Sequence, residues 1–311
     1  MLDLLDICSS ALGTTRENAL VIARTAPYRL KRIEIPKQDG SKRITWQAAI
    51  ETKGLHYPLI QYYLRQLPAH PASQAFSPGS SIIKNAGIHL GNKYFLRIDF
   101  SDFFPSIKFN SFKKIINQTK SIFENFNTAT PESMLLLEKA CFAKDSSLPI
   151  GYATSPYIAN CTMFEFDREI IDLLRAKFAS ANVTYTRYAD DLVFSTNIKN
   201  ACRDIYDVIV QFVKKYRAID LTINHKKTHF GSVPKGTAYV TGVHMLESNR
   251  TAATKTLRSE ARFLLSLRKK NKLDDDEQKR LFGLLAHIRQ IDPAFYTKLA
   301  SDFHVAFPHT K

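Results

Sequence analysis

The chain has 311 residues, 44% of them hydrophobic, which is enough to bury a sizeable core and predicts about two globular units. Lys and Arg total 44 against 29 for Asp and Glu, a net charge of +15. A chain this basic indicates a polyanionic partner, and an aromatic content of 11% suits base stacking as well as core packing. A generally basic surface is the alternative interpretation of the charge.

Several classes are disfavoured by the same composition. The four cysteines lie far apart in apolar or helical contexts, which indicates buried, reduced thiols in place of disulfides or a zinc site. No apolar run reaches membrane-spanning length, and Asp3 and Asp6 stand where a signal peptide would carry basic residues. We therefore expect a cytoplasmic protein with no membrane partner.

Residues 1–26 predict two short helices, the second opened by a capping box between Thr14 and Glu17. Residues 28–45 then predict a β-hairpin, because Asp39-Gly40 separates two β-rich runs and glycine accepts the backbone that the turn requires. Lys37 and Arg43 make this hairpin basic. It could fold over a phosphate group or be an ordinary solvated hairpin, and the sequence weighs these about evenly.

A helix over about 47–67 ends before Pro68. A further helix is expected to end at Asn85-Ala86-Gly87-Ile88-His89, with Gly87 suited to a helix C-terminus.

Residues 94–100 predict a strongly apolar strand with Asp99 near its end. A carboxylate there is costly unless it is paired, so Asp99 is a candidate metal ligand. Asp102 is expected to cap the following turn or helix. Phe104 comes next and could be either a core aromatic or part of a site.

Residues 108–147 are mostly helical, with an amphipathic segment over 131–144. The run Leu148 to Pro156 breaks this pattern: Gly151 allows close approach of the backbone to a ligand, and Ser155-Pro156 can open a helix reaching about Phe178.

Residues 185–195 predict a second hairpin, with Asp190 and Asp191 at its tip. Adjacent carboxylates repel each other, so the turn suits a cation; an Asp-rich surface turn is the alternative. A helix over 200–216 follows. Strand, helix, hairpin, helix, strand is the order of a ferredoxin-like fold, which places Asp99 and Asp190 at neighbouring strand ends.

Beyond this unit, the sequence around Lys227 is that of a solvated loop lysine. Residues 231–237 predict a turn, and residues 239–243 an apolar strand with a bulge or close approach at Gly242. From Thr254 the chain is helical and basic, and the acids of residues 274–277 are expected to open a helix.

Three motifs resemble those of known enzymes. Tyr188-Ala189-Asp190-Asp191 resembles the Tyr-x-Asp-Asp signature of reverse transcriptases. The elements Asn85 to His89 and Val240-Thr241-Gly242 are similar to those of the retron kind. The resemblance implies an α+β, right-hand polymerase: N-terminal helices and fingers over 1–98, a ferredoxin-like palm over 99–249 with a helical fingers insertion over 108–147, and a helical basic thumb over 250–311.

The same resemblance implies roles for individual residues. Asp99, Asp190 and Asp191 would be the catalytic acids that hold two Mg²⁺ ions, and Phe104 would exclude a ribose 2′-OH. The implied nucleotide-binding residues are Lys37, Arg43, Phe104, Gly151 and Lys227. At position 150 this chain has Ile where reverse transcriptases usually have Gln. Whether this residue contacts the nucleotide is therefore left open. The implied RNA-binding residues are Asn85, His89, Val240, Thr241, Gly242, Arg258, Arg262 and Lys269.

Retron resemblance also implies a function and partners. The enzyme would use a structured non-coding RNA as template and as 2′-OH primer, and would join deoxynucleoside triphosphates into branched RNA-linked DNA (msDNA). Anti-phage defence with a separate effector protein is implied as well. A group II intron-like or diversity-generating reverse transcriptase is one alternative, and a non-catalytic RNA-binding protein is another.

Overall fold

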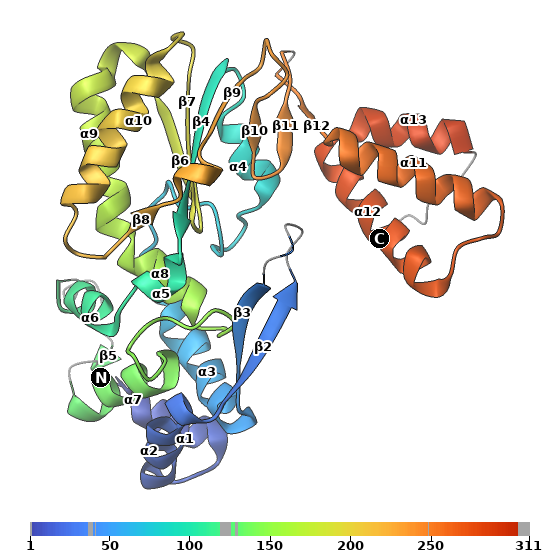
Figure 1. Ribbon diagram of the computed structural model, residues 1–311. Helices are drawn as coiled ribbons and strands as arrows, with labels where there is room; N and C mark the ends of the chain where they lie inside the picture. Colours follow the sequence, from blue (N-terminus) through green and yellow to red (C-terminus); the bar gives the residue numbers. More distant parts are fainter. Residues whose placement is uncertain are drawn as a thin grey trace.

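An antiparallel sheet lies at the centre of the computed structural model, which describes residues 2–36, 40, 42–118, 126–127, 130–247 and 249–303 (Figure 1). Its strand order is β6-β7-β4-β8, with β9 also pairing with β4. The strands are β4 (Tyr94–Ser101), β6 (Thr184–Tyr188), β7 (Asp191–Thr196), β8 (Thr222–Ile223) and β9 (His229–Ser232). Antiparallel pairing sets Asp99 opposite Asp191, so the predicted meeting of the two acidic motifs is confirmed.

Helices cover one face of this sheet. They are α8 (Ser155–Thr162), α9 (Phe164–Phe178) and α10 (Ala201–Lys215), and Figure 1 shows α9 and α10 side by side against it. The apolar side chains of α9 that repeat at helical spacing, Phe166, Ile170 and Leu174, are buried there. The single helix predicted over 155–178 is wrong, because the chain breaks at Met163 between α8 and α9.

The N-terminal helices pack with a helix from the middle of the chain. They are α1 (Leu4–Leu12), α2 (Arg16–Thr25), α3 (Ile50–Tyr62) and α7 (Pro131–Cys141). Helix α2 begins with an N-cap at Thr15, whose hydroxyl accepts from the Asn18 N–H at 3.2 Å, so the predicted cap at Thr14 is displaced by one residue. The predicted basic hairpin is formed by β2 (Leu30–Pro36) and β3 (Lys42–Ala48).

Short elements connect these units. They are β1 (Leu2–Asp3), η1 (Ala26–Tyr28), η2 (Leu64–Gln66), α4 (Ile82–Ile88), α5 (Phe103–Ser106), α6 (Phe109–Gln118), β5 (Phe126–Asn127), η4 (Ala179–Ala181) and η5 (His225–Lys227). The N-cap position of α5 is Asp102, but its side chain makes no capping hydrogen bond, so the predicted capping role is not fulfilled.

The C-terminal part consists of a small sheet and three helices. The strands are β10 (Tyr239–Val240), β11 (Val243–Met245) and β12 (Thr251–Ala252), and the helices are α11 (Lys255–Lys269), α12 (Asp275–Ile291) and α13 (Pro293–Phe303). Asp274 and Glu277 form a capping box at the start of α12, as the acids there predict. The interruption predicted at Gly242 in the apolar strand over 239–243 is a full turn and not a bulge, because Thr241 and Gly242, at φ 47° and 80°, turn the chain between β10 and β11.

Two buried hydrophobic clusters hold the described residues together. One joins the N-terminal helices to the helical face of the sheet. The other joins the opposite sheet face, through Phe95 and Val193, to α11, α12 and α13. The predicted domain boundaries stay a prediction. The four cysteines are buried and unpaired, as expected, and none of the described helices is long and apolar enough to cross a membrane.

Candidate functional site

The acids lie at the ends of neighbouring strands. Asp99 is 7% exposed in β4, opposite Asp191 of β7, and the Phe100 N–H donates to the Asp190 carbonyl at 3.2 Å. On the other side of β4, the Asn224 N–H donates to the Asp99 carbonyl at 2.8 Å. This brings in Lys227, whose Nζ lies 3.1 Å from Asp99 Oδ2. The sheet ladder therefore assembles two acidic motifs and a lysine that are far apart in the sequence.

Burial and neighbouring carboxylates raise the pKa of Asp190 and of Asp191. Burial is the main cause of the raised pKa of Asp190, and the nearby Asp99 charge adds to it, while Lys227 and Arg43 act against it. Burial likewise raises the pKa of Asp191 to about 6, with Arg97, 4.0 Å from its Oδ1, acting in the opposite direction. Negative charge is thus concentrated where water is partly excluded, and a bound cation would reduce the repulsion between the carboxylates.

The residues present fit a divalent ion. Asp99 Oδ2 is buried and accepts no regular hydrogen bond from the described residues, so only the Lys227 ammonium group compensates it. Among those residues, no three metal-ligating side chains come together, since Asp191 turns toward Arg97. Mg²⁺ is commonly held by one or two carboxylates together with substrate phosphates. Asp99 and Asp190 suit that mode, and the share of Asp191 stays a prediction.

The turn that carries the acids has a strained backbone. Ala189 has φ 56°, a conformation that a residue with a Cβ rarely adopts. Its carbonyl accepts a hydrogen bond at 3.2 Å from the Nη1 of Arg187, a side chain with no exposed surface. A buried guanidinium thus fixes the turn from beneath.

A polar network surrounds that guanidinium. Arg187 forms a bidentate pair with Asp167 of α9, with Nε 2.9 Å from Oδ1 and Nη2 2.8 Å from Oδ2. Tyr185 also donates to Asp167 at 2.8 Å, and Arg187 reaches Asn160 of α8 at 3.3 Å. Both members of the ion pair are fully buried. The acidic turn is therefore tied to the helical layer by charged hydrogen bonds, which are stronger than neutral ones.

A cavity of about 1150 Å³ opens beside the turn. Asp190, Lys227, Arg43 and Phe104 line it, so four predicted site residues from four parts of the chain meet there. Phe104 is half-buried, with its ring edge-on to Phe103 at 5.3 Å, which fits both the core and the site interpretation. Lys37 lies outside the described residues.

Gly151 serves a close approach between two backbones. At φ 107°, a Cβ on it would lie 2.7 Å from the Trp46 carbonyl oxygen of β3. Beside it, the Trp46 N–H donates to the Ile150 carbonyl at 2.7 Å. Both Ile150 and Trp46 line the cavity. Gly151 thus joins the basic hairpin to the wall of the cavity, and its predicted contact with a nucleotide stays a prediction.

The predicted RNA contacts of Asn85 and His89 are wrong for the structure described, because neither side chain has exposed surface. The His89 Nε2 lies 2.7 Å from the Thr186 hydroxyl and its Nδ1 lies 2.7 Å from that of Ser195. Burial lowers the pKa of His89 to about 3, so the ring is neutral. This motif fastens α4 to the sheet.

The remaining residues that were predicted to bind RNA differ in how exposed they are. Val240 is fully buried, which rules out a direct contact of its side chain, while Gly242 is exposed at the turn. Thr241 donates to the Ile82 carbonyl at 3.3 Å. Arg258 is held by Asp292 at 2.6 Å, whereas the other two thumb residues are exposed on α11: Arg262 and Lys269.

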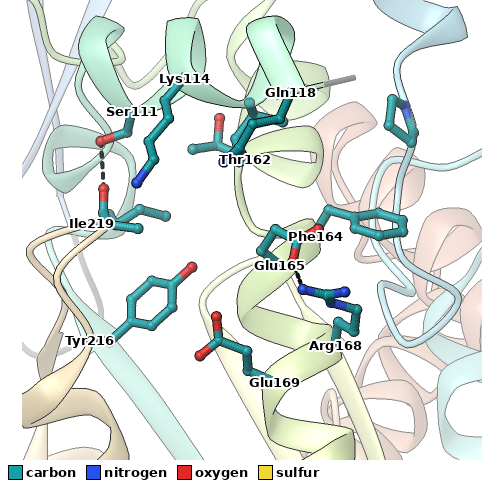
Figure 2. Close-up of a pocket in the computed structure, with 13 residues that line it drawn as sticks. Ser111, Lys114, Gln118, Thr162, Phe164, Glu165, Arg168, Glu169, Tyr216 and Ile219 are labelled. Carbon is teal, nitrogen blue, oxygen red and sulfur yellow. Dashed lines mark hydrogen bonds and ion pairs between the residues drawn. The ribbon is translucent and has the colours of Figure 1, made fainter. Parts of the chain in front are cut away.

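A second cavity, of about 570 Å³, lies between α6, α9 and the segment after α10 (Figure 2). Lys114, Glu169 and the Tyr216 hydroxyl point into it from three elements. Burial and the acids nearby, Glu169 first among them, raise the pKa of Tyr216. None of the residues predicted for catalysis or nucleotide binding lines this cavity, whereas several of them line the first one.

Three residues of the site escaped the sequence prediction: Arg187, Asp167 and Phe76. Asp167 falls on the apolar face of α9, one residue after Phe166 and three before Ile170, where an isolated surface acid is unexpected. Arg187 and Tyr188 are neighbours in a β-rich run, so their side chains point to opposite faces of the strand. A charged residue on the inward face was the signal that could have identified Arg187. Phe76 offered only its place before Ser-Pro-Gly.

Comparisons with known proteins agree with this geometry. Residues 35–264 match the family model "Reverse transcriptase (RNA-dependent DNA polymerase)". The chain is 36% identical to the Retron Ec73 reverse transcriptase of Escherichia coli, over 88% of this chain and 87% of that protein. It is 27% identical to the Retron Ec83 reverse transcriptase of Escherichia coli, over 92% and 90% respectively.

A solved structure supports the fold alone. The Sicinivirus 3Dpol RNA-dependent RNA polymerase matches with a TM-score of 0.51 at 12% identity, over 92% of this chain and 64% of the viral one. The right-hand polymerase fold predicted from the motifs is thus confirmed. The chain belongs to the reverse transcriptase family and, within it, to the retron reverse transcriptases, and it is an RNA-directed DNA polymerase.

Proposed function

We propose that this polymerase copies a structured non-coding RNA that also supplies the priming 2′-OH, and so makes branched RNA-linked DNA. The observation that carries the proposal is the register of Asp99 against Asp191 beside Lys227, in a chain 36% identical to a retron enzyme. An initiating hydroxyl inside a folded RNA must be held in line with the first nucleotide, and positioning of this kind accounts for much of catalysis.

Asp99 and Asp190 would hold Mg²⁺, with Asp191 more peripheral. A pair of such ions, when bound, lowers the pKa of an attacking hydroxyl and neutralises charge on the leaving pyrophosphate. Side chains of the protein would contact the rest of the nucleotide. Arg43 and Lys227 face the cavity with positive charge suited to a triphosphate, and the Phe104 ring would collide with a ribose 2′-OH.

RNA would lie along the thumb. Arg262 and Lys269 are exposed on α11, and folded RNA is recognised mainly through its shape and backbone, which cationic side chains serve. Gly242, exposed at its turn, would let the RNA backbone approach closely. We further propose that a separate effector protein acts with the enzyme in defence against phage.

The test is the nucleic acid that copurifies with the protein. We expect DNA joined to RNA at one guanosine by a branch that resists alkali, and none from the Asp99→Asn variant. Unbranched DNA primed from an RNA 3′ end would overturn the proposal while leaving the polymerase activity intact.

A further inference from the structure

Phe76 has an unusual backbone for its residue type. Its φ is 60°, in the left-handed region that glycine and asparagine tolerate and that a bulky side chain normally avoids. Its side chain is also 43% exposed, and it belongs to neither hydrophobic cluster of the described residues. Both properties cost stability, so folding alone does not account for this residue.

The residues before Phe76 are fixed by the network beneath the acidic turn. The Gln74 N–H donates to the Arg187 carbonyl at 2.7 Å, and the Ala75 carbonyl accepts from Asn160 Nδ2 at 2.7 Å. Ser73 donates to the Oδ1 of the same Asn160 at 2.8 Å. The segment therefore has no freedom to move Phe76 into a relaxed conformation.

The residues after Phe76 are fixed as well. The Ser80 N–H donates to the Ser77 carbonyl at 3.0 Å, and the Ser80 hydroxyl reaches the same oxygen at 2.6 Å. A strained residue held from both sides, next to an active site, is the arrangement in which strain serves function.

Phe76 lines the cavity that Asp190 also lines. Arg43 and Phe104 line it too, and the centroid of the Phe76 ring lies 6.5 Å from that of Phe104. Two aromatic residues from different parts of the chain therefore give the cavity an apolar lining beside its charged groups. Aromatic side chains stack on nucleobases without regard to sequence, since every base has a π face.

We propose that Phe76 is a substrate-contacting residue whose ring packs against a nucleobase at the site of synthesis. The inference rests on the proposed placement of the nucleotide in this cavity. The base belongs either to the incoming deoxynucleotide or to the template strand, and both present the same flat apolar face. The network of Arg187 and Asn160 then joins the base contact to the acidic turn.

The experiment compares Phe76→Gly with Phe76→Tyr in primer extension on a generic RNA–DNA duplex. Glycine relieves the backbone and removes the ring, so we expect a higher melting temperature together with either a nucleotide KM or a template Kd raised at least tenfold. Tyrosine keeps the ring and should keep the KM within about twofold. A matched control, Asn182→Gly at φ 43° in an exposed turn outside the cavity, should leave the kinetics unchanged.

The outcomes separate the two sources of the base. A raised nucleotide KM with unchanged template affinity assigns the contact to the incoming nucleotide, and weakened template binding assigns it to the template. Unchanged KM and template affinity in Phe76→Gly, or a lowered melting temperature, would overturn the proposal. Phe104→Ala tests the cavity independently: altered sugar selectivity there with no effect at Phe76 leaves the nucleotide site standing and removes only this inference.

Discussion

Two polar clusters are buried against the same hairpin, β6 and β7, and they use opposite chemistry. Near the acidic tip, Arg187 and Asp167 form a fully buried ion pair. On the other face, neutral His89 bonds the hydroxyls of Thr186 and Ser195. Charged hydrogen bonds hold geometry more tightly but are costly to break. This fold therefore uses charge where the position of a functional turn matters and neutral bonds where packing suffices.

The largest effect should come from Asp99, which lies in β4 opposite the acidic tip. Asp99→Asn removes a charge that metal requires, and the lost stabilisation of several kcal/mol corresponds to a fall in DNA synthesis of roughly 10³-fold or more. RNA binding should survive, since the basic surface is unchanged. Primer extension and RNA gel shifts measure the two properties, and a parallel loss of RNA binding would contradict the assignment.

The charged cluster should come next. Arg187→Met leaves the Asp167 carboxylate buried and unpaired, which costs about 3–5 kcal/mol of unfolding free energy. The double variant Arg187→Met with Asp167→Leu should recover most of that stability, because apolar replacement of a buried pair is often neutral. DNA synthesis should stay low in both, since the Ala189 carbonyl loses its donor. Full recovery of synthesis in the double variant would reduce Arg187 to a purely structural role.

The neutral cluster should respond more weakly. His89→Ala leaves the hydroxyls of Thr186 and Ser195 without this partner, at a cost of about 1–3 kcal/mol in urea unfolding. RNA affinity should not change at a temperature where the variant is folded, because the ring is buried. Weaker RNA binding by folded protein would restore the recognition role that the motif suggested.

The last effects concern pH, and their signs differ between Asp191 at the acidic turn and His89 in the neutral cluster. Burial raises the pKa of Asp191 to about 6, so in metal-free protein its ionisation lowers stability as pH rises from about 4 to 6. Burial lowers the pKa of His89 to about 3, so the stability that the neutral ring contributes to the folded protein is lost as pH falls below about 6.5. The free energy of unfolding of Asp191→Asn and of His89→Gln is measured against pH, and that of the parent protein is subtracted. The two differences should therefore change with pH in opposite directions. Added Mg²⁺ should stabilise the parent more than Asp191→Asn.

The sequence was sufficient for the parts of the fold that follow from periodicity. The apolar run of residues 94–100, the β-rich runs of residues 185–195 and the apolar spacing of α10 identified the central strands and a helix, and their order brought Asp99 to the acidic hairpin. The acids of residues 274–277 also indicated the start of α12. These features depend on neighbours in the chain.

The remaining features depend on contacts between distant segments. The break at Met163 and the turn at Thr241 and Gly242 oppose the local pattern, and tertiary packing decides both. Arg187 looks like a surface charge until its partner on α9 is known. His89 carried a motif typical of a family, yet its burial became visible only once the sheet was assembled.

The junction at Gly151 has a mechanical consequence. Because the Trp46 N–H is bonded to the Ile150 carbonyl and a Cβ at Gly151 would collide with the Trp46 carbonyl oxygen, the base of the β2–β3 hairpin is clamped to the palm. The hairpin is therefore held at Trp46 to the wall of the cavity. Arg43 lies three residues from Trp46 in β3, so this backbone contact also sets where the cationic side chain lines the cavity.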